Sequence, residues 1–279
     1  MDLYELVLNI KDKKELRGIS EDFLIKIIKK ELKKRPYLYE KIKNSKNFKI
    51  LKRDEDFIYF FKEIRKILHE AFGVFAPKDL REIYRIVHDD ISIEEKVIQI
   101  LMINLSTKER LNFYKEIYSK IFIEDPIEIM DLASGLNPIS ILFSDKRPRK
   151  YYFIDLLEDV IEINTVILRD MGIEPYGYVL DITDLDNDII KRHYQYIFLW
   201  KTIPVLEKLD RRLPYSLLSN IDFDYLIVSF PQKSLGKMRS IGKFWRYWIR
   251  RVAKNLNYEI IKEFDIPYEF FVVIRKKSS

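Results

Sequence analysis

The sequence contains no cysteine, and its 279 residues include only three histidines. Disulfides, cysteine nucleophiles and thiolate metal sites all require cysteine, so its absence excludes each of them. The histidines, His69, His88 and His193, are too scattered to predict a zinc site. We therefore expect a protein without a bound metal. A chain free of cysteine is compatible with the cytoplasm, where we place it.

Long apolar runs are also missing. The sequence has no stretch of about 18 apolar residues, which a membrane-spanning helix requires, and its first residues lack the layout of a signal peptide. We expect no membrane partner. Glycine is scarce, with seven residues, whereas lysine, glutamate, isoleucine and tyrosine are abundant. This bias is typical of hyperthermophile proteins with many surface ion pairs, and it predicts a high melting temperature.

An excess of positive charge indicates an anionic partner. The chain has 50 lysines and arginines against 44 acidic residues, which gives a net charge of +6. Such a balance favours polyanions, but it does not distinguish nucleic acid from an acidic membrane surface. With 47% hydrophobic residues, the chain is long enough for a full core and for two domains.

Helical patterns fill residues 1–105. The clearest is Glu21–Leu32, which follows Ser20 as the expected N-cap and stops before Pro36. Apolar residues occupy one face of this helix, and basic residues occupy the opposite face. The basic residues are Lys26, Lys29, Lys30, Lys33, Lys34 and Arg35. Such a run is either a solvated surface or a surface that contacts RNA phosphates, and the sequence leaves both interpretations open.

The most informative stretch is Ile127–Asp155. An apolar run ends on Asp131, a short loop and a helical turn follow, and a second apolar run ends on Asp155, 20 residues after Gly135. In nucleotide-binding α/β folds, a carboxylate at this place meets the ribose hydroxyls. The loop has one glycine instead of three, which fits S-adenosylmethionine (SAM) better than NAD because SAM has no pyrophosphate. The alternative is an ordinary βαβ unit without a ligand.

From residue 127 onward, strands alternate with helices, which predicts a parallel sheet. Because ligands bind at the carboxyl ends of such strands, residues found there define a candidate cofactor site. We expect Ala133 and Gly135 to pass close to SAM and Asp155 to hold its ribose. Asp181 and Ile182 would flank the adenine, and Leu199 would lie near the methyl group. For each single residue, a strand-end position at the solvent boundary is the alternative.

Residues 229–254 form a second informative stretch. Basic and aromatic residues alternate along it, a composition that suits an RNA backbone and an extruded base. The residues expected to contact RNA are Lys233, Lys237 and Arg239. The alternative is an amphipathic helix with core aromatics, and we expect Phe244, Trp248 and Val252 to belong to the core.

Four motifs resemble the aminoglycoside-resistance 16S rRNA guanine-N7 methyltransferases. They are Ser106–Leu111 (STKERL), Asp131–Pro138 (DLASGLNP), Ile197–Leu206 (IFLWKTIPVL) and Val228–Gly236 (VSFPQKSLG). The resemblance covers nearly the whole chain and is clearest after about residue 104. Where the family usually has glycine, cysteine, histidine and glutamine, this chain has Ala133, Ser134, Asn104 and Lys208. These differences bear more on the target nucleotide than on the cofactor.

The resemblance implies an α/β fold, with a class I (Rossmann-like) seven-stranded methyltransferase sheet that binds SAM and a helical N-terminal domain that docks RNA. We place the helical domain at residues 1–105 and the SAM-binding domain at 106–279. The resemblance also implies that Arg110 meets the methionyl carboxylate of SAM and that Phe75 lines the cofactor pocket. The implied partner is 16S rRNA within the 30S subunit, and we expect a monomer.

Guanine N7 carries a lone pair and no proton, so its methylation needs positioning rather than a general base. We accordingly expect no catalytic acid or base, only positioning by Trp200 and Lys201. The Asn/Asp-Pro-Pro-Tyr/Phe motif of amino-group methyltransferases is absent after Tyr196–Trp200, the fourth strand that we expect. Two alternatives remain: methylation of another RNA, such as tRNA or large-subunit rRNA, and a non-catalytic RNA- or ribosome-binding protein on a methyltransferase fold.

Overall fold

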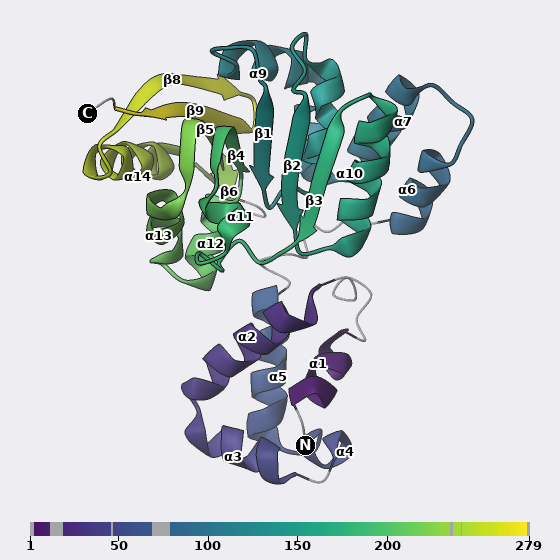
Figure 1. The fold of residues 1–279 in the computed structure, drawn as a ribbon. Coiled ribbons are helices and arrows are strands. Elements are labelled where there is room, and N and C mark those ends of the chain that lie inside the picture. Colours follow the sequence, from purple (N-terminus) through teal and green to yellow (C-terminus); the bar gives the residue numbers. More distant parts are fainter. Residues whose placement is uncertain are drawn as a thin grey trace. The chain divides into compact units, whose positions relative to one another are not determined.

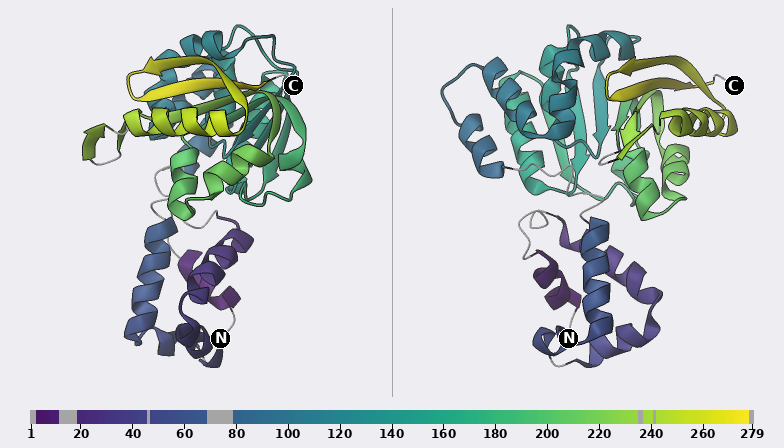
Figure 2. Two further views of the ribbon diagram at one scale, coloured as in Figure 1. Left: turned by 90° about the vertical axis from the view of Figure 1, so that its left-hand side faces the viewer. Right: turned by 180° about the vertical axis from the view of Figure 1, so that it is seen from behind.

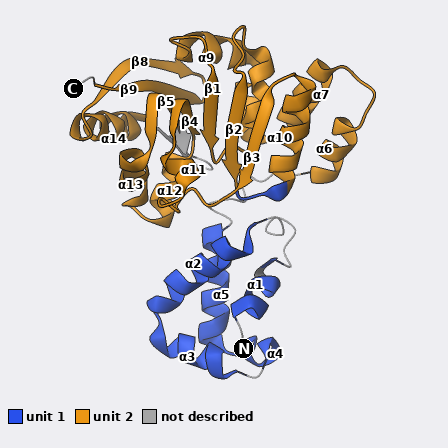
Figure 3. Cartoon of the chain, in the orientation of Figure 1, with its two compact units in different colours: residues 1–76, 156–158 blue, residues 77–155, 159–279 orange. Residues whose placement is uncertain are grey.

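The computed structural model describes residues 3–11, 19–45, 47–68, 79–234, 237–240 and 242–277. The chain forms two compact units, which we describe separately (Figure 3). Unit 1 comprises residues 1–76 and 156–158, and unit 2 comprises residues 77–155 and 159–279. Phe75, which the resemblance places in the cofactor pocket, lies outside the described residues.

Unit 1 is helical within its described residues. Its helices are α1 (Leu3–Lys11), α2 (Glu21–Lys33), α3 (Pro36–Asn44), α4 (Phe48–Leu51) and α5 (Glu55–Leu68). Helix α2 buries Phe23, Leu24, Ile27, Ile28 and Leu32, as its sequence spacing predicts. Pro36 is the first residue of α3, where its fixed φ and missing N–H suit a helix start. Phe57 and Phe60 of α5 are buried in the same unit.

Unit 2 contains a seven-stranded sheet in the order β3-β2-β1-β4-β5-β9-β8 (Figure 1). The strands are β1 (Glu128–Leu132), β2 (Lys150–Asp155), β3 (Glu174–Val179), β4 (His193–Trp200), β5 (Asp222–Pro231), β8 (Tyr258–Ile266) and β9 (Glu269–Lys276). Strands β1 to β5 are parallel, and β9 pairs antiparallel with both β5 and β8. In the sequence, β5 is followed by a separate two-stranded hairpin, β6 (Lys233–Ser234) and β7 (Lys237–Ser240), which is not part of the main sheet. The predicted α/β fold class with a seven-stranded sheet is confirmed.

Helices cover both faces of the sheet (Figures 1 and 2). One face packs against residues of α6 (Leu80–Val87), α7 (Ile93–Ile103), α9 (Tyr114–Ile121), η4 (Asn137–Phe143) and α10 (Glu158–Asp170). The other packs against α11 (Asp188–Lys191), α12 (Ile203–Leu209), α13 (Leu213–Asn220) and α14 (Gly242–Asn255). Alternate residues of a strand point to opposite faces. Phe198 and Trp200 of β4 therefore join the first layer, while Leu199 joins the second.

The division between the units differs from the boundary expected at residue 105. Helices α6 and α7 belong to unit 2, because their buried residues Ile83, Val97 and Leu101 join the core on one face of the sheet. Short segments α8 (Leu105–Arg110) and η3 (Leu111–Phe113) continue from α7 into α9. The periodicity of a helix shows which of its faces is buried but not which core receives that face. Among the described residues, no helix is long and apolar enough to cross a membrane.

Candidate active site

The loop after β1 bends sharply at two residues. Ala133 and Gly135 have φ angles of 56° and 52°, in the left-handed region. Glycine adopts this conformation freely, whereas for alanine it is strained. Backbone hydrogen bonds hold the loop against the neighbouring strand, because the Ser134 N–H donates to the Ile154 carbonyl at 2.9 Å. The loop therefore lies across the carboxyl end of β2.

Asp155, the last residue of β2, meets this loop directly. Its Oδ2 accepts a hydrogen bond from the Gly135 N–H at 2.9 Å. The Gly135 carbonyl in turn accepts from Asn164 Nδ2 of α10 at 2.7 Å. Gly135 and Asp155, both predicted from their spacing, are thus in direct contact, and Asn164 of α10 holds the loop through a second hydrogen bond.

Asp181 follows β3 at the same edge of the sheet. The register of β2 and β3 places Asp155 opposite Val179, two residues before Asp181. The Asp181 carboxylate accepts hydrogen bonds from the Thr183 N–H at 2.8 Å and from its hydroxyl at 2.7 Å, which forms a tight turn. Ile182 beside it is buried in the second core layer. Carboxylates therefore stand at the ends of three neighbouring strands, since Asp131 lies near the end of β1.

A buried cluster of charges lies at the end of β4. Arg110 donates two hydrogen bonds to Glu269, from Nε at 2.8 Å and from Nη2 at 2.9 Å. Lys201 Nζ lies 2.7 Å from Glu109 Oε2 and 3.3 Å from Glu269 Oε2. The side chains of Arg110 and Glu269 are only 3% and 0% exposed. Two cations and two carboxylates thus neutralise one another, and only Glu109, at 25%, is more than about a tenth exposed.

The ionisation of Glu269 depends on this pairing. Burial alone would raise the pKa of its carboxyl, but the charges of Arg110 and Lys201 and the Arg110 hydrogen bonds hold that pKa below its usual value. Glu269 therefore remains an anion, and it fixes both cations at once. Arg110, expected to bind a cofactor carboxylate, has two of its five donors committed to Glu269.

Backbone geometry aims Lys201 into the cluster. Its φ is 57°, unusual for a residue other than glycine. The Lys201 N–H donates to the Ser229 carbonyl at 3.1 Å and to the Ser229 hydroxyl at 3.0 Å. Trp200 precedes it and packs beneath Arg110, whose Cζ lies 5.1 Å from the indole ring. Leu199 is fully buried, so its side chain forms part of the core below the site.

A chain of hydrogen bonds links further residues to the β1 loop. The Tyr114 hydroxyl donates to Asn137 Oδ1 at 3.3 Å, and Asn137 Nδ2 donates to Asp131 Oδ2 at 2.9 Å. The Tyr151 hydroxyl donates to the same Asp131 oxygen at 3.3 Å. Burial raises the pKa of the Asp131 carboxyl to about 7, against the lowering effect of the Asn137 hydrogen bond. This carboxyl therefore exchanges its proton near neutral pH.

The basic residues expected to bind RNA fall into two groups. Just after α2, Lys34 and Arg35 form ion pairs with Glu31 of that helix, and Arg35 also pairs with Glu63. Their charges are therefore partly neutralised, whereas Lys29 and Lys33 are exposed. Lys26 is also exposed and Lys30 is half-buried. In the second group, Lys233, Lys237 and Arg239 belong to the β6–β7 hairpin, which leaves the carboxyl end of β5.

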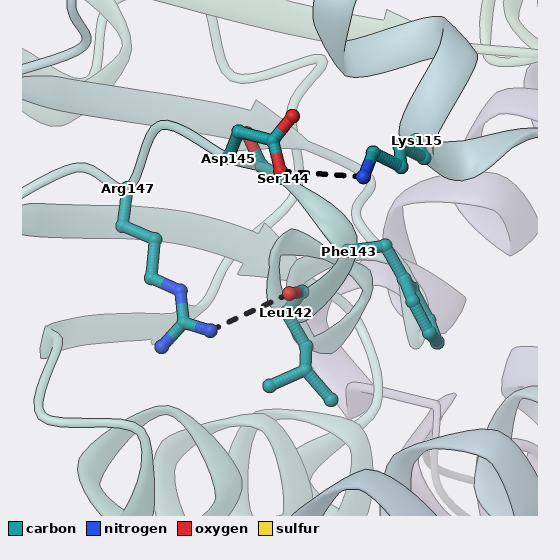
Figure 4. Close-up of a pocket in the computed structure, with 6 residues that line it drawn as sticks. All are labelled: Lys115, Leu142, Phe143, Ser144, Asp145 and Arg147. Atoms are coloured by element: carbon teal, nitrogen blue, oxygen red, sulfur yellow. Dashed lines mark hydrogen bonds and ion pairs between the residues drawn. The ribbon is translucent and has the colours of Figure 1, made fainter.

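An open pocket of about 690 Å³ lies elsewhere in unit 2 (Figure 4). It is lined by Lys115, Leu142, Phe143, Ser144, Asp145 and Arg147. Lys115 Nζ lies 3.6 Å from Asp145, and Arg147 donates to the Leu142 carbonyl at 3.5 Å. None of the predicted cofactor residues lines this pocket. Among the described residues, no group of three or more histidine or acidic side chains could hold a metal ion.

Sequence reasoning missed Glu269, Tyr114 and Asn137, and it gave Glu109 no role in the site. Glu269 stands at the start of an apolar strand, where an acid has to be paired if it is buried. That position is the only signal it leaves, because its partner Arg110 is 159 residues away in the sequence.

Comparisons with known proteins give a consistent result. The sequence model of the FmrO family, described as ribosomal RNA methyltransferases, matches residues 62–252. A 16S rRNA (guanine(1405)-N(7))-methyltransferase from Frankia casuarinae is 27% identical over 209 residues, which cover 67% of this chain and 69% of that protein. The enzyme of the same name from Micromonospora echinospora is 28% identical over 198 residues, which cover 67% and 71%.

Solved structures share the fold over almost the full length. The 16S rRNA methylase RmtB superposes with a TM-score of 0.76 at 20% identity, covering 99% of each chain. RmtF, a 16S rRNA methyltransferase solved in complex with S-adenosyl-L-homocysteine, also gives 0.76, at 21% identity and 99% and 100% coverage. Since the family match spans more than half of the chain, the protein belongs to the FmrO family of ribosomal RNA methyltransferases.

Proposed function

We propose that this protein transfers a methyl group from SAM to N7 of a guanine in 16S ribosomal RNA. The observation that carries the proposal is the geometry at the strand ends, where the Gly135 amide binds Asp155 at the end of β2. The neutral cluster of Arg110, Lys201, Glu109 and Glu269 lies at the end of β4 in the same sheet. Membership of the family and relatives named as guanine-N7 methyltransferases support the same chemistry.

The residues present fit SAM by their chemistry. Asp155 offers a carboxylate to the ribose hydroxyls, and Asp181 offers an acceptor to the adenine amine. Ala133 and Gly135, with small side chains and left-handed backbone, allow a ligand to approach the loop. Arg110 retains further donors for a ligand carboxylate. When bound, SAM supplies a methyl group activated by a positively charged sulfur.

The transfer requires no proton movement at the reacting atom. The N7 lone pair forms the new N–C bond while the C–S bond of the donor breaks, and positive charge passes to the purine ring. The residues of this chain position the base and exclude water. Trp200 provides a packed, rigid floor, and Lys201 is held in place by Glu109, Glu269 and Ser229.

RNA docking is assigned to basic surfaces outside the site. In unit 1 we assign it to the exposed side of α2, chiefly Lys29 and Lys33. In unit 2 we assign it to the β6–β7 hairpin, because this hairpin begins two residues after Pro231, the end of β5. Ser229 of β5 accepts a hydrogen bond from the Lys201 N–H, so the strand that leads into the hairpin also contacts the candidate active site. We propose that the protein acts as a monomer on the 30S subunit, in the cytoplasm.

The decisive experiment is transfer of labelled methyl groups from SAM to three RNAs of the source organism, followed by nucleoside mass analysis. The RNAs are assembled 30S subunits, naked 16S rRNA and tRNA. Label in 7-methylguanosine from the 30S sample is expected. Label in tRNA or in another nucleoside would refute the proposed target but would still support SAM-dependent methylation of RNA. RNA binding without any SAM binding would favour a non-catalytic RNA-binding protein.

A variant separates cofactor binding from RNA binding. Asp155→Ala should abolish SAM binding in calorimetry and leave RNA affinity unchanged. Asp170→Ala is the matched control, because Asp170 is an exposed acid at the end of α10. Equal loss of SAM binding in both variants would contradict the role given to Asp155.

We further propose that the protein comes from a heat-loving organism. Networks of surface ion pairs support this, for example Arg246 and Arg250, which share Glu263, and Arg246 with Asp265. A melting temperature above about 90 °C is expected. A value within the range of mesophile domains, about 45–65 °C, would refute the proposal.

A further inference from the structure

Helix α14 packs against the sheet through one side only. Trp245, Ile249 and Val252 are buried in the second core layer. The Trp245 ring stacks on Phe230 of β5 with centroids 5.3 Å apart. The helix lies beside β8 and β5 (Figures 1 and 2). Its orientation is therefore fixed, and so is the set of side chains that it presents to solvent.

Two large aromatic side chains stand on the exposed side. Phe244 is 54% exposed and Tyr247 is 68% exposed. The prediction that Phe244 belongs to the core is wrong. Residues three apart on a helix are neighbours on its surface, so the two rings lie on one face. Phe244 also contacts Trp245 edge to face, with centroids 5.0 Å apart, which restricts its motion.

The charges of α14 divide in the same way. The helix has five cationic residues and no acid. Arg250 donates to Glu263 from Nε at 2.8 Å, and Arg246 pairs with Glu263 and Asp265. Lys243, Arg251 and Lys254 are exposed. Within the described part of the chain, no acidic partner is found for these three. Two arginines of α14 thus form ion pairs within the protein, and the other three positive charges are available to another molecule.

These exposed residues form one stripe. Positions 243, 244, 247, 251 and 254 follow the spacing of a single helix face. At 1.5 Å per residue the stripe is about 16 Å long. The stripe begins next to the candidate active site. Gly242, the first residue of α14, lies against Gln232: a Cβ built on this glycine would be 3.7 Å from the Gln232 Cα. Gln232 Nε2 donates to the backbone carbonyl of the cluster residue Glu269 at 3.3 Å.

We propose that this stripe is an RNA-binding surface, in which a base stacks on Tyr247 and phosphates contact Lys243, Arg251 and Lys254. This inference rests on the proposed function and specifies where the substrate RNA leaves the site. A row of cations with interleaved rings is the chemistry that single-stranded RNA requires. A membrane-surface helix would instead use its broad apolar face, and here that face is buried against the sheet.

The experiment compares variants of the full-length protein on 30S subunits. Tyr247→Ala removes the ring, and Tyr247→Phe keeps it. Arg251→Glu with Lys254→Glu reverses two charges. Arg169→Glu is the charge control, because Arg169 is exposed on α10. For each variant, KM for 30S subunits, KM for SAM, the salt dependence of RNA binding and the melting temperature are measured.

Tyr247→Ala should raise KM for 30S subunits between about 5- and 150-fold, as expected for a lost base stack. Tyr247→Phe should stay within about twofold of wild type, because the ring face is retained. The double reversal should weaken RNA binding and reduce its salt slope by about 0.7 to 0.9 for each lost phosphate contact. KM for SAM, the melting temperature and the Arg169→Glu variant should be unchanged.

Unchanged KM for 30S subunits and unchanged RNA binding in both Tyr247→Ala and the double reversal would overturn the proposal. So would loss of binding to vesicles of anionic lipid in these variants with RNA binding intact, which would assign the stripe to a membrane surface. Equilibrium RNA binding separates this result from failure of the proposed function. If the wild-type protein methylates no RNA but binds RNA through Tyr247, the RNA-binding surface is supported and the proposed methyl transfer is refuted.

Discussion

Replacement of Asp131 by asparagine should change how the stability of unit 2 depends on pH. Asp131 is 1% exposed. Its carboxyl accepts hydrogen bonds from Asn137 at 2.9 Å and Tyr151 at 3.3 Å. Burial nevertheless raises its pKa to about 7. Asparagine has nearly the same shape, carries no charge and keeps an oxygen for both donors, so the variant removes the titration with little change in packing.

The sign of the effect follows from the two pKa values. The folded protein holds the Asp131 proton up to a pKa of about 7, whereas the carboxyl has a model value of 3.8. The stabilisation from this proton is complete below the unfolded pKa and is lost as the pH rises through the folded pKa. Between pH 5 and pH 8, the expected loss from this group alone is roughly 2 to 3 kcal/mol.

Denaturant unfolding between pH 5 and pH 8 at constant ionic strength measures the effect. All three tryptophans of the chain, Trp200, Trp245 and Trp248, lie in unit 2, so their fluorescence reports on that unit alone. The free energy of unfolding of wild type minus that of Asp131→Asn should fall by roughly 2 to 3 kcal/mol over this range. Asp145→Asn, at an exposed acid, is the control. A difference between wild type and Asp131→Asn that does not vary with pH would refute the reasoning.

Three further predictions use the same unfolding or binding assays. Ala133→Gly should stabilise the protein by up to about 1 kcal/mol, because it relieves the left-handed φ of 56°; any destabilisation would contradict this. Glu269→Ala should destabilise it by about 3 to 5 kcal/mol, since two buried cations lose their shared anion; a loss below about 1 kcal/mol would show that the cluster rearranges. Lys29→Glu with Lys33→Glu should weaken RNA binding and lower its salt slope without affecting SAM binding; equal loss of both would disprove the separation.

The parts of the fold that depend on local pattern could be predicted from the sequence. Strand-helix alternation after residue 127 predicted the parallel sheet. A strand, a loop and a second strand with acids at both strand ends placed Gly135 and Asp155 at one site, where the structure shows them in contact. That contact follows from topology, because adjacent parallel strands end at the same edge. The order of the strands in the sheet was not predicted from the sequence.

The parts that depend on distant pairing could not be predicted. Arg110 and Glu269 are 159 residues apart, and no local pattern joins them. Helix α14 shows a subtler limit, because its sequence suits more than one apolar stripe. The sequence favoured Phe244, Trp248 and Val252 as core residues. The structure buries Val252 together with Trp245 and Ile249, leaves Trp248 half-buried against the core and exposes Phe244. Phe244 and Trp245 are adjacent, about 100° apart around the helix, and the packing of Trp245 against Phe230 decides which of the two is buried.

The distribution of charge agrees with the chemistry proposed. Methylation at N7 leaves the guanine positively charged, so an unpaired cation beside the base would oppose the reaction. The two cations at the site, Arg110 and Lys201, are instead balanced by Glu109 and Glu269. Phosphate binding, in contrast, needs unbalanced positive charge, and this is found on exposed surfaces such as the α14 stripe. The net charge of +6 can therefore serve RNA affinity without acting on the reacting base.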